Sequence, residues 1–213
     1  MLLEGIINSY LFSLSSLENG KAECGVQTMI EEMNHIKKLY HTKEPIEKVL
    51  RECVCSRKGH QYCISEQAVN EAVDRLMKGE CLLSGRKKCP LIDNGQIFDK
   101  FNDFEELYSI INQIIGDING IGALTVYDTA KRIGHIFENP IYPRQYVYLF
   151  AGAANGAKNL FSNKALGFRE PISMFTPYFG TLPSIFIEDI LCVWSNQLNG
   201  LNVQQNRTLK TTP

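Results

Sequence analysis

Soft metal ligands are concentrated in one stretch of the chain. Between residues 53 and 89 lie five of the seven cysteines and one histidine: Cys53, Cys55, His60, Cys63, Cys81 and Cys89. Thiolates and imidazoles suit tetrahedral zinc, but zinc sites usually pair two Cys-x2–4-Cys knuckles, and this spacing does not. Cys53 also completes the helical apolar stripe of Ile46, Val49 and Leu50, where a free thiol acts as a small hydrophobic side chain. We therefore assign no metal and leave zinc open as the alternative.

Side chains for acid–base catalysis form no recognisable set. Glu188 and Asp189 are adjacent, but neighbours on a helix point about 100° apart and cannot easily share a site. The four histidines follow no triad order, and neither a P-loop nor a dinucleotide fingerprint is present. We assign no catalytic residue and no cofactor; enzymatic activity is left open but not favoured.

The clearest pattern is a glycine turn between two amphipathic helices. In the first helix, Asn102 with Glu105 forms a capping-box pattern, and one face carries Phe104, Leu107, Tyr108, Ile111, Ile114, Ile115 and Ile118. After the turn Asn119-Gly120-Ile121-Gly122, apolar residues recur in helical steps at Val126, Ala130, Ile133 and Phe137. A helix start offers unpaired N–H donors and a positive dipole end, and glycine permits close approach, so such a turn suits an anion.

This stretch resembles the helix–hairpin–helix motif. In that family two glycines reverse the chain, an apolar residue between them fills the gap, and amides of the second helix face a phosphate of a nucleic acid. The resemblance implies a turn at Gly120 and Gly122, with Ile121 as the plug. It implies that the phosphate meets the amides of Gly122, Ala123 and Leu124, the hydroxyl of Thr125, and charge from Lys131, Arg132 and Lys158.

The sequence departs from that family in ways that bear on activity. Val126 stands where the family has alanine, which comes one turn later at Ala130, so the helices are expected to pack further apart or in a shifted register. DNA glycosylases of this superfamily carry a catalytic lysine at the position of Leu124. Asp128-Thr129 lies too close to the turn to match their Asp-Thr element. Glycosylase chemistry is therefore disfavoured.

A second stretch, residues 149–160, is rich in glycine and alanine. It fits either a degenerate second hairpin or a helix whose small residues allow close packing, and we favour the helix. Residues 124–134, 146–149 and 156–158 together are also similar to a group of uncharacterised bacterial proteins, which implies a recurring domain but no activity.

Composition is that of an ordinary globular protein, with 44% hydrophobic and 21% charged residues. The chain lacks a run of 18 apolar residues and a basic leader, and its odd number of cysteines favours reduced thiols. We expect a cytoplasmic protein with no membrane contact. The net charge of −1 excludes a general attraction to polyanions, but residues 131–169 carry Lys131, Arg132, Arg144, Lys158, Lys164 and Arg169 against Glu138 alone.

These patterns predict an all-α fold, a helical bundle that contains a helix-hairpin-helix element. We expect an N-terminal helical region over 1–80, a linker over 81–98, the hairpin-containing domain over 99–198 and a frayed tail over 199–213. The predicted function is non-enzymatic binding of a nucleic-acid backbone, DNA in the first instance, without strong sequence preference. The alternatives are a protein-interaction scaffold and a nucleic-acid enzyme with an unrecognised site.

Overall fold

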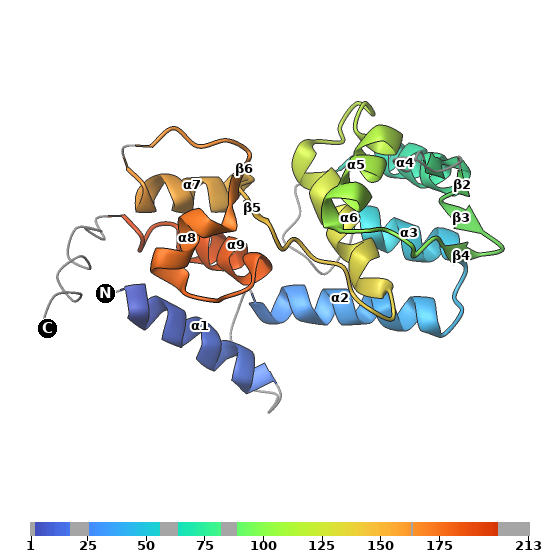
Figure 1. The fold of residues 1–213 in the computed structure, drawn as a ribbon. Coiled ribbons are helices and arrows are strands. Elements are labelled where there is room, and N and C mark those ends of the chain that lie inside the picture. The colour runs from blue at the N-terminus through green and yellow to red at the C-terminus, as the bar shows by residue number, and fades with distance from the viewer. Residues whose placement is uncertain (1–2, 18–25, 56–63, 82–88, 163, 200–213) are drawn as a thin grey trace, which may run out of the picture. The chain divides into compact units, whose positions relative to one another are not determined.

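The computed structural model describes residues 3–17, 26–55, 64–81, 89–162 and 164–199, and this part of the chain is mostly helical (Figure 1). The helices are α1 (Leu3–Leu17), α2 (Val26–His41), α3 (Ile46–Val54), α4 (Glu66–Lys78), α5 (Phe104–Ile115), α6 (Ala123–Ile136), α7 (Ala151–Leu160), α8 (Ile172–Phe179) and α9 (Ser184–Val193). The described strands form antiparallel pairs: β1 (Glu80–Cys81) with β2 (Cys89–Pro90), β3 (Ile92–Asp93) with β4 (Gln96–Ile97), and β5 (Tyr146–Tyr148) with β6 (Arg169–Pro171). The expected mostly helical fold is confirmed.

None of the described helices combines the length and apolar character needed to span a bilayer.

The chain divides into two compact units. Unit 1 contains residues 1–26 and 144–213, and unit 2 contains residues 27–143. The division does not fall at residues 81–98, where we expected a linker, and it splits the expected domain 99–198 at 143/144. The end of the expected linker belongs to unit 2, since Leu91 is fully buried and its amide donates to the Gly79 carbonyl at 2.8 Å. The expected tail lies outside the described residues beyond Asn199.

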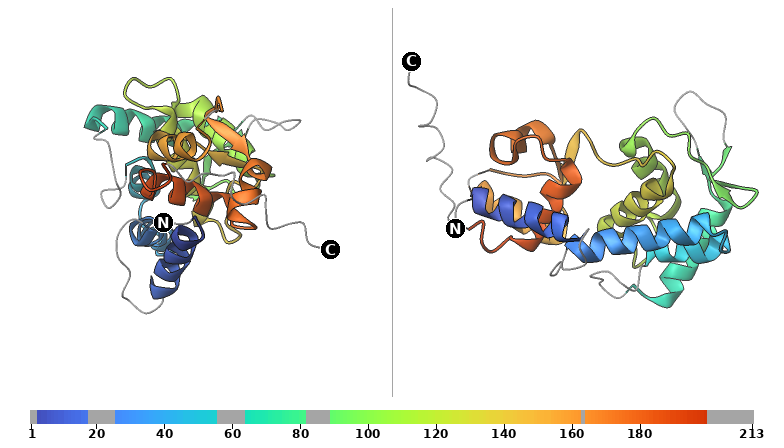
Figure 2. Two further views of the ribbon diagram at one scale, coloured as in Figure 1. Left: turned by 90° about the vertical axis from the view of Figure 1, so that its left-hand side faces the viewer. Right: turned by 90° about the horizontal axis from the view of Figure 1, so that it is seen from below.

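Unit 2 is built on two pairs of helices. α3 packs against α4 and α6, and α5 packs against α4 and α6, as Figures 1 and 2 also show. The apolar faces predicted from sequence supply the core: Phe104, Leu107, Ile111, Val126, Ala130, Ile133 and Phe137 are buried. Gly134, one turn beyond Ala130 on α6, stands in a crowded place. A Cβ added to Gly134 would lie 2.3 Å from the Ile141 carbonyl oxygen and 3.3 Å from Leu107 Cδ2.

The start of α5 is capped one residue later than expected. Asp103, not Asn102, is the N-cap residue, and its Oδ1 accepts from the Glu106 amide at 2.9 Å. Glu106 Oε2 in turn accepts from the Asn102 amide at 2.7 Å. The arrangement is close to the expected capping box, but its carboxylate comes from Glu106 and accepts from the amide of the residue before the N-cap.

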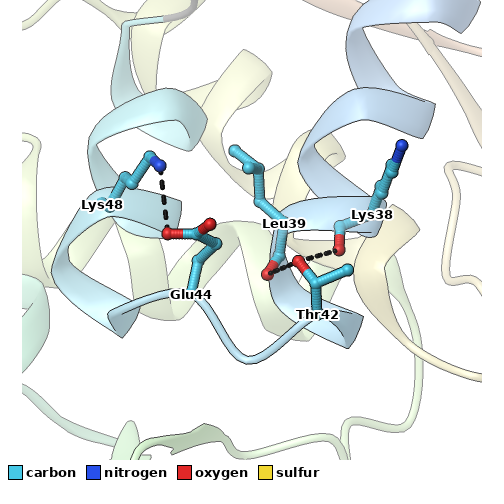
Figure 3. Close-up of polar contacts among 5 residues, drawn as sticks. All are labelled: Lys38, Leu39, Thr42, Glu44 and Lys48. Atoms are coloured by element: carbon cyan, nitrogen blue, oxygen red, sulfur yellow. Dashed lines mark hydrogen bonds and ion pairs between the residues drawn. The ribbon is translucent and has the colours of Figure 1, made fainter.

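The connection between α2 and α3 is held by local polar contacts (Figure 3). The Thr42 hydroxyl donates to the carbonyls of Lys38 and Leu39, at 2.9 and 3.2 Å, and so satisfies acceptors in the last turn of α2. Lys48 forms an exposed ion pair with Glu44 at 3.0 Å at the start of α3.

In unit 1, α7 packs against α9, and α9 also contacts β5. Residues 151–160 form one continuous helix, so the expected helix with closely packed small residues is confirmed. A Cβ added to Gly156 would lie 2.0 Å from the Leu191 carbonyl oxygen, and one added to Gly152 would lie 2.6 Å from Cys192 Sγ. The glycines therefore allow the two helix backbones to touch.

Candidate nucleic-acid interface

The loop between α5 and α6 reverses the chain around two buried isoleucines. The Ile118 amide donates to Ile115 at 3.2 Å, and the Ile121 amide donates to Ile118 at 2.9 Å. The side chains of Ile118 and Ile121 are buried, so Ile121 occupies the interior position predicted for it. Gly120 has φ +92°, a conformation that residues with a Cβ rarely adopt.

Gly122 is the N-cap residue of α6, and no described group packs against the position that a Cβ would take there. Its backbone is extended, with φ −95° and ψ 169°, and a Cβ added there would meet no atom within 4 Å. Gly122 and Ala123 are exposed, and Leu124 and Thr125 are half-buried. The first internal bond of the helix runs from the Val126 amide to the Gly122 carbonyl at 3.1 Å. The corner where we expected a phosphate is therefore not covered by described neighbouring side chains.

The N–H groups at this helix start have no acceptor among the described residues. This holds for Gly122, Ala123 and Leu124, and α6 has neither a side-chain cap nor an acidic residue in its first turn. By contrast, Ser65 caps α4 and Asp103 caps α5, and both of those helices have glutamate in the first turn. The positive end of the α6 dipole is thus left without a counter-charge from its own helix.

The charges predicted beside this turn are not available to a ligand. Arg132 is buried, and its Nη2 pairs with Glu32 Oε1 at 2.6 Å while its Nη1 donates to the Cys53 carbonyl at 2.9 Å. Lys131 is 7% exposed, and its Nζ lies 3.2 Å from Asp128 Oδ1. Both of the cations that we expected to contact a phosphate are therefore enclosed within unit 2.

Two further positions complete the surroundings of the turn. A Cβ added to Gly120 would lie 3.5 Å from the Cβ of Ala68, so the turn packs against the first part of α4. Asp117, in the same loop, pairs with Arg75 at 2.6 Å, and Arg75 also pairs with Glu71. The loop carboxylate is therefore matched by a cation from α4, which limits its repulsion of an approaching anion.

Lys158, the third predicted cation, is exposed on α7 and so belongs to unit 1. The same unit contains Arg144, Lys164 and Arg169, so four of the six cations counted after the turn lie outside the unit that carries it. The local basic surplus read from the sequence is therefore divided between the two units.

The cysteine cluster is only partly within the described residues. Cys53 is fully buried, and burial raises the pKa of its thiol to about 12, which fits its predicted place in the apolar stripe of α3. Cys81 lies opposite Cys89 in the β1–β2 pair. His60 and Cys63 lie outside the described residues. Among the residues that are described, no group of three metal-ligating side chains comes together.

The sequence did not identify the partner that encloses Arg132. Glu32 is 100 positions before it, and its side chain is 7% exposed. The only local signal is that Glu32 stands next to Met33 in a helix whose apolar face is formed by Met33 and Ile36. It also did not identify the aromatic residues around Arg169, where the rings of Tyr146, Tyr148 and Phe168 lie within 6.0 Å of the guanidinium.

Comparison of the whole chain with models of known protein families, with curated proteins and with solved structures found no match.

Proposed function

We propose that the protein binds the phosphate backbone of nucleic acid, DNA in the first instance, at the start of α6 in a helix-hairpin-helix element. The observation that carries this proposal is the exposed, uncapped set of N–H groups at Gly122, Ala123 and Leu124 after a glycine turn. Backbone N–H groups at a helix start, with the positive end of the dipole behind them, are suited to a phosphate. They read no base edges, so this binding has no strong sequence preference.

The burial of Lys131 and Arg132 lowers the salt dependence that is expected for the binding. Each phosphate neutralised by a lysine or arginine changes the slope of log affinity against log salt by about −0.9. Since these two cations are enclosed in unit 2, the slope is smaller in magnitude by about 1.8 than it would be if both contacted phosphates. Backbone amides then contribute more of the contact, through hydrogen bonds that release no counterions.

The test is a carboxylate placed at the helix start. Ala123→Asp adds a negative charge beside the three amides and gives them an internal acceptor, so it competes with a phosphate while it favours the helix dipole. Asn139→Asp is the matched control, because it adds the same residue at an exposed position beyond the other end of α6. The helix has 14 residues, so the two positions are separated by about 20 Å along it.

Affinity for a labelled DNA duplex is measured by fluorescence anisotropy over a salt series. We expect Ala123→Asp to weaken binding about tenfold, or about 1.4 kcal/mol, without loss of thermal stability, and Asn139→Asp to bind within about twofold of the unmodified protein. Equal weakening by both variants would show a general charge effect and contradict the proposed site. Absence of any salt-dependent duplex binding at micromolar protein would contradict the proposal as a whole.

A further inference from the structure

A cation enclosed by aromatic rings lies on the β5–β6 ribbon of unit 1. The Arg169 guanidinium is 4.5 Å from the ring centre of Tyr146, 5.4 Å from that of Phe168 and 6.0 Å from that of Tyr148. Phe168 also stacks on Phe150, with ring centres 6.2 Å apart and planes inclined by 24°. We call these five residues the Arg169 cluster.

The cluster is anchored at one side and open at the other. Tyr148 is fully buried and pairs with Arg169 across the ribbon, and its hydroxyl accepts from Arg169 Nη1 at 3.3 Å. Phe168 is 53% exposed, which makes it one of the most exposed large apolar side chains in the described part of the chain. Its neighbour Arg169 is half-buried. The ribbon therefore holds a planar cation in a fixed place and presents an aromatic ring beside it.

Packing accounts for the buried half of the cluster but not for the exposed ring. Tyr148 fills the interior of unit 1, whereas about half of the Phe168 side chain remains in contact with water. An exposed aromatic ring next to a guanidinium suits the stacking of an unpaired base, because every base has a π face and the cation adds attraction to it.

The charge of the surrounding chain matches such a ligand. From residue 144 to residue 170 the charged residues are Arg144, Lys158, Lys164, Arg169 and Glu170. Arg144, Lys158 and Lys164 are exposed, while Glu170 Oε1 is engaged by the Gly167 amide at 2.7 Å. A net positive segment with an exposed aromatic ring fits a strand with bases to stack and phosphates to neutralise.

We propose that the Arg169 cluster binds unpaired nucleotides of a single-stranded nucleic acid, with a base stacked on Phe168 beside the Arg169 guanidinium. This site goes beyond the duplex-backbone contact proposed at α6, since it uses other residues in the other unit and reads a different feature of the ligand. Stacking tolerates any base, so binding shows little sequence preference.

The test measures binding of the full chain to a labelled 12-nucleotide oligothymidine by fluorescence anisotropy. Removal of the exposed ring by Phe168→Ala is expected to weaken binding about tenfold, or about 1.4 kcal/mol, which is within the usual value of one stacked base. Phe168→Trp keeps a stacking face and is expected to retain affinity within about twofold. The matched control is Phe12→Ala, because Phe12 is 73% exposed on α1 of the same unit and is not part of the cluster.

Several results would overturn the inference. These are an affinity of Phe168→Ala equal to that of the unmodified protein, an equal loss in Phe12→Ala, or no binding of oligothymidine at 100 µM protein, a concentration of about the weak-binding limit for a non-specific site. The Ala123→Asp variant separates this site from the one proposed at α6. It is expected to weaken duplex binding and leave oligothymidine binding unchanged, and Phe168→Ala is expected to do the reverse. If oligothymidine binding follows Ala123→Asp and ignores Phe168→Ala, the Arg169 cluster is not the site.

Discussion

Gly122 in unit 2 and Gly156 in unit 1 both stand in stretches of small residues, yet their surroundings are opposite. A Cβ at Gly122 would meet nothing within 4 Å, whereas one at Gly156 would lie 2.0 Å from the Leu191 carbonyl oxygen. The first glycine leaves a helix start open to an external group, and the second lets α7 and α9 pack backbone to backbone. Glycine therefore leaves a helix start exposed in one unit and allows two helix backbones to pack closely in the other.

The cations of the two units differ in the same way. Arg132 follows the glycine turn in sequence but is enclosed with Glu32, whereas Lys158 on α7 is exposed. The position of a cation in the sequence after a turn therefore does not determine whether it is accessible to a ligand. Its accessibility depends on whether it is paired and buried in the fold. This contrast leads to the following predictions.

The largest effect is expected at the buried ion pair of unit 2. Arg132→Ala leaves the Glu32 carboxylate buried without its partner, so we expect the free energy of unfolding to fall by about 3–5 kcal/mol. Lys158→Ala is the control, since it removes an exposed cation and should change the free energy of unfolding by less than about 0.5 kcal/mol. Urea denaturation followed by circular dichroism measures both. Equal, small effects would show that Arg132 is accessible, as the sequence first suggested.

A somewhat smaller effect is expected from the packed glycine of unit 1. Gly156→Ala forces α7 away from the Leu191 carbonyl, and we expect a destabilisation of about 3 kcal/mol. Gly122→Ala meets no atom and no unfavourable φ. Its entropic gain is offset by the poor preference for alanine at an N-cap, so the net change should stay below about 1 kcal/mol. Thermal unfolding of the two variants checks the difference. A tolerated Gly156→Ala would contradict the close α7–α9 contact.

The smallest change, counted for each pH unit, is expected from acid titration of unit 2. Burial and the nearby Lys37 lower the pKa of His135 to about 4, so its ring stays neutral in the folded protein at pH values where the unfolded chain binds a proton. Between about pH 6.5 and pH 4 the free energy of unfolding should therefore fall as the pH falls, by at most about 1.4 kcal/mol per pH unit from this group.

His135→Gln should flatten that slope. Denaturant unfolding at several pH values measures the slopes. An unaltered slope in His135→Gln would mean that the ring is protonated within the folded protein.

Local patterns predicted much of unit 2 correctly. The apolar faces of α5 and α6 follow a helical period, and the residues named from it, such as Phe104, Ile111 and Ile133, are buried. The glycine turn and its plug were also visible, because Ile121 lies between two glycines that only a tight reversal explains. These features depend on residues less than a few turns apart, which sequence reasoning can relate to one another.

Features set by distant residues could not be predicted. Arg132 is buried because Glu32, 100 positions earlier, meets it, and unit 1 brings α1 together with residues that begin after Pro143. Cys192 stands among apolar residues in the sequence, yet it is exposed, while its neighbours Ile190 and Leu191 on α9 are buried. In each case the burial of the side chain depends on which face of the helix packs against another element. The local sequence does not determine which face that is.

Amide resonances of the α6 start offer the most direct test of the central claim. In a titration of ¹⁵N-labelled protein with a short DNA duplex, we expect the N–H signals of Gly122, Ala123 and Leu124 to shift together, and the shifts to diminish with added salt. If duplex binds at saturation while these three signals remain in place and others move, the helix start is not the contact, and the proposed mode of binding is contradicted.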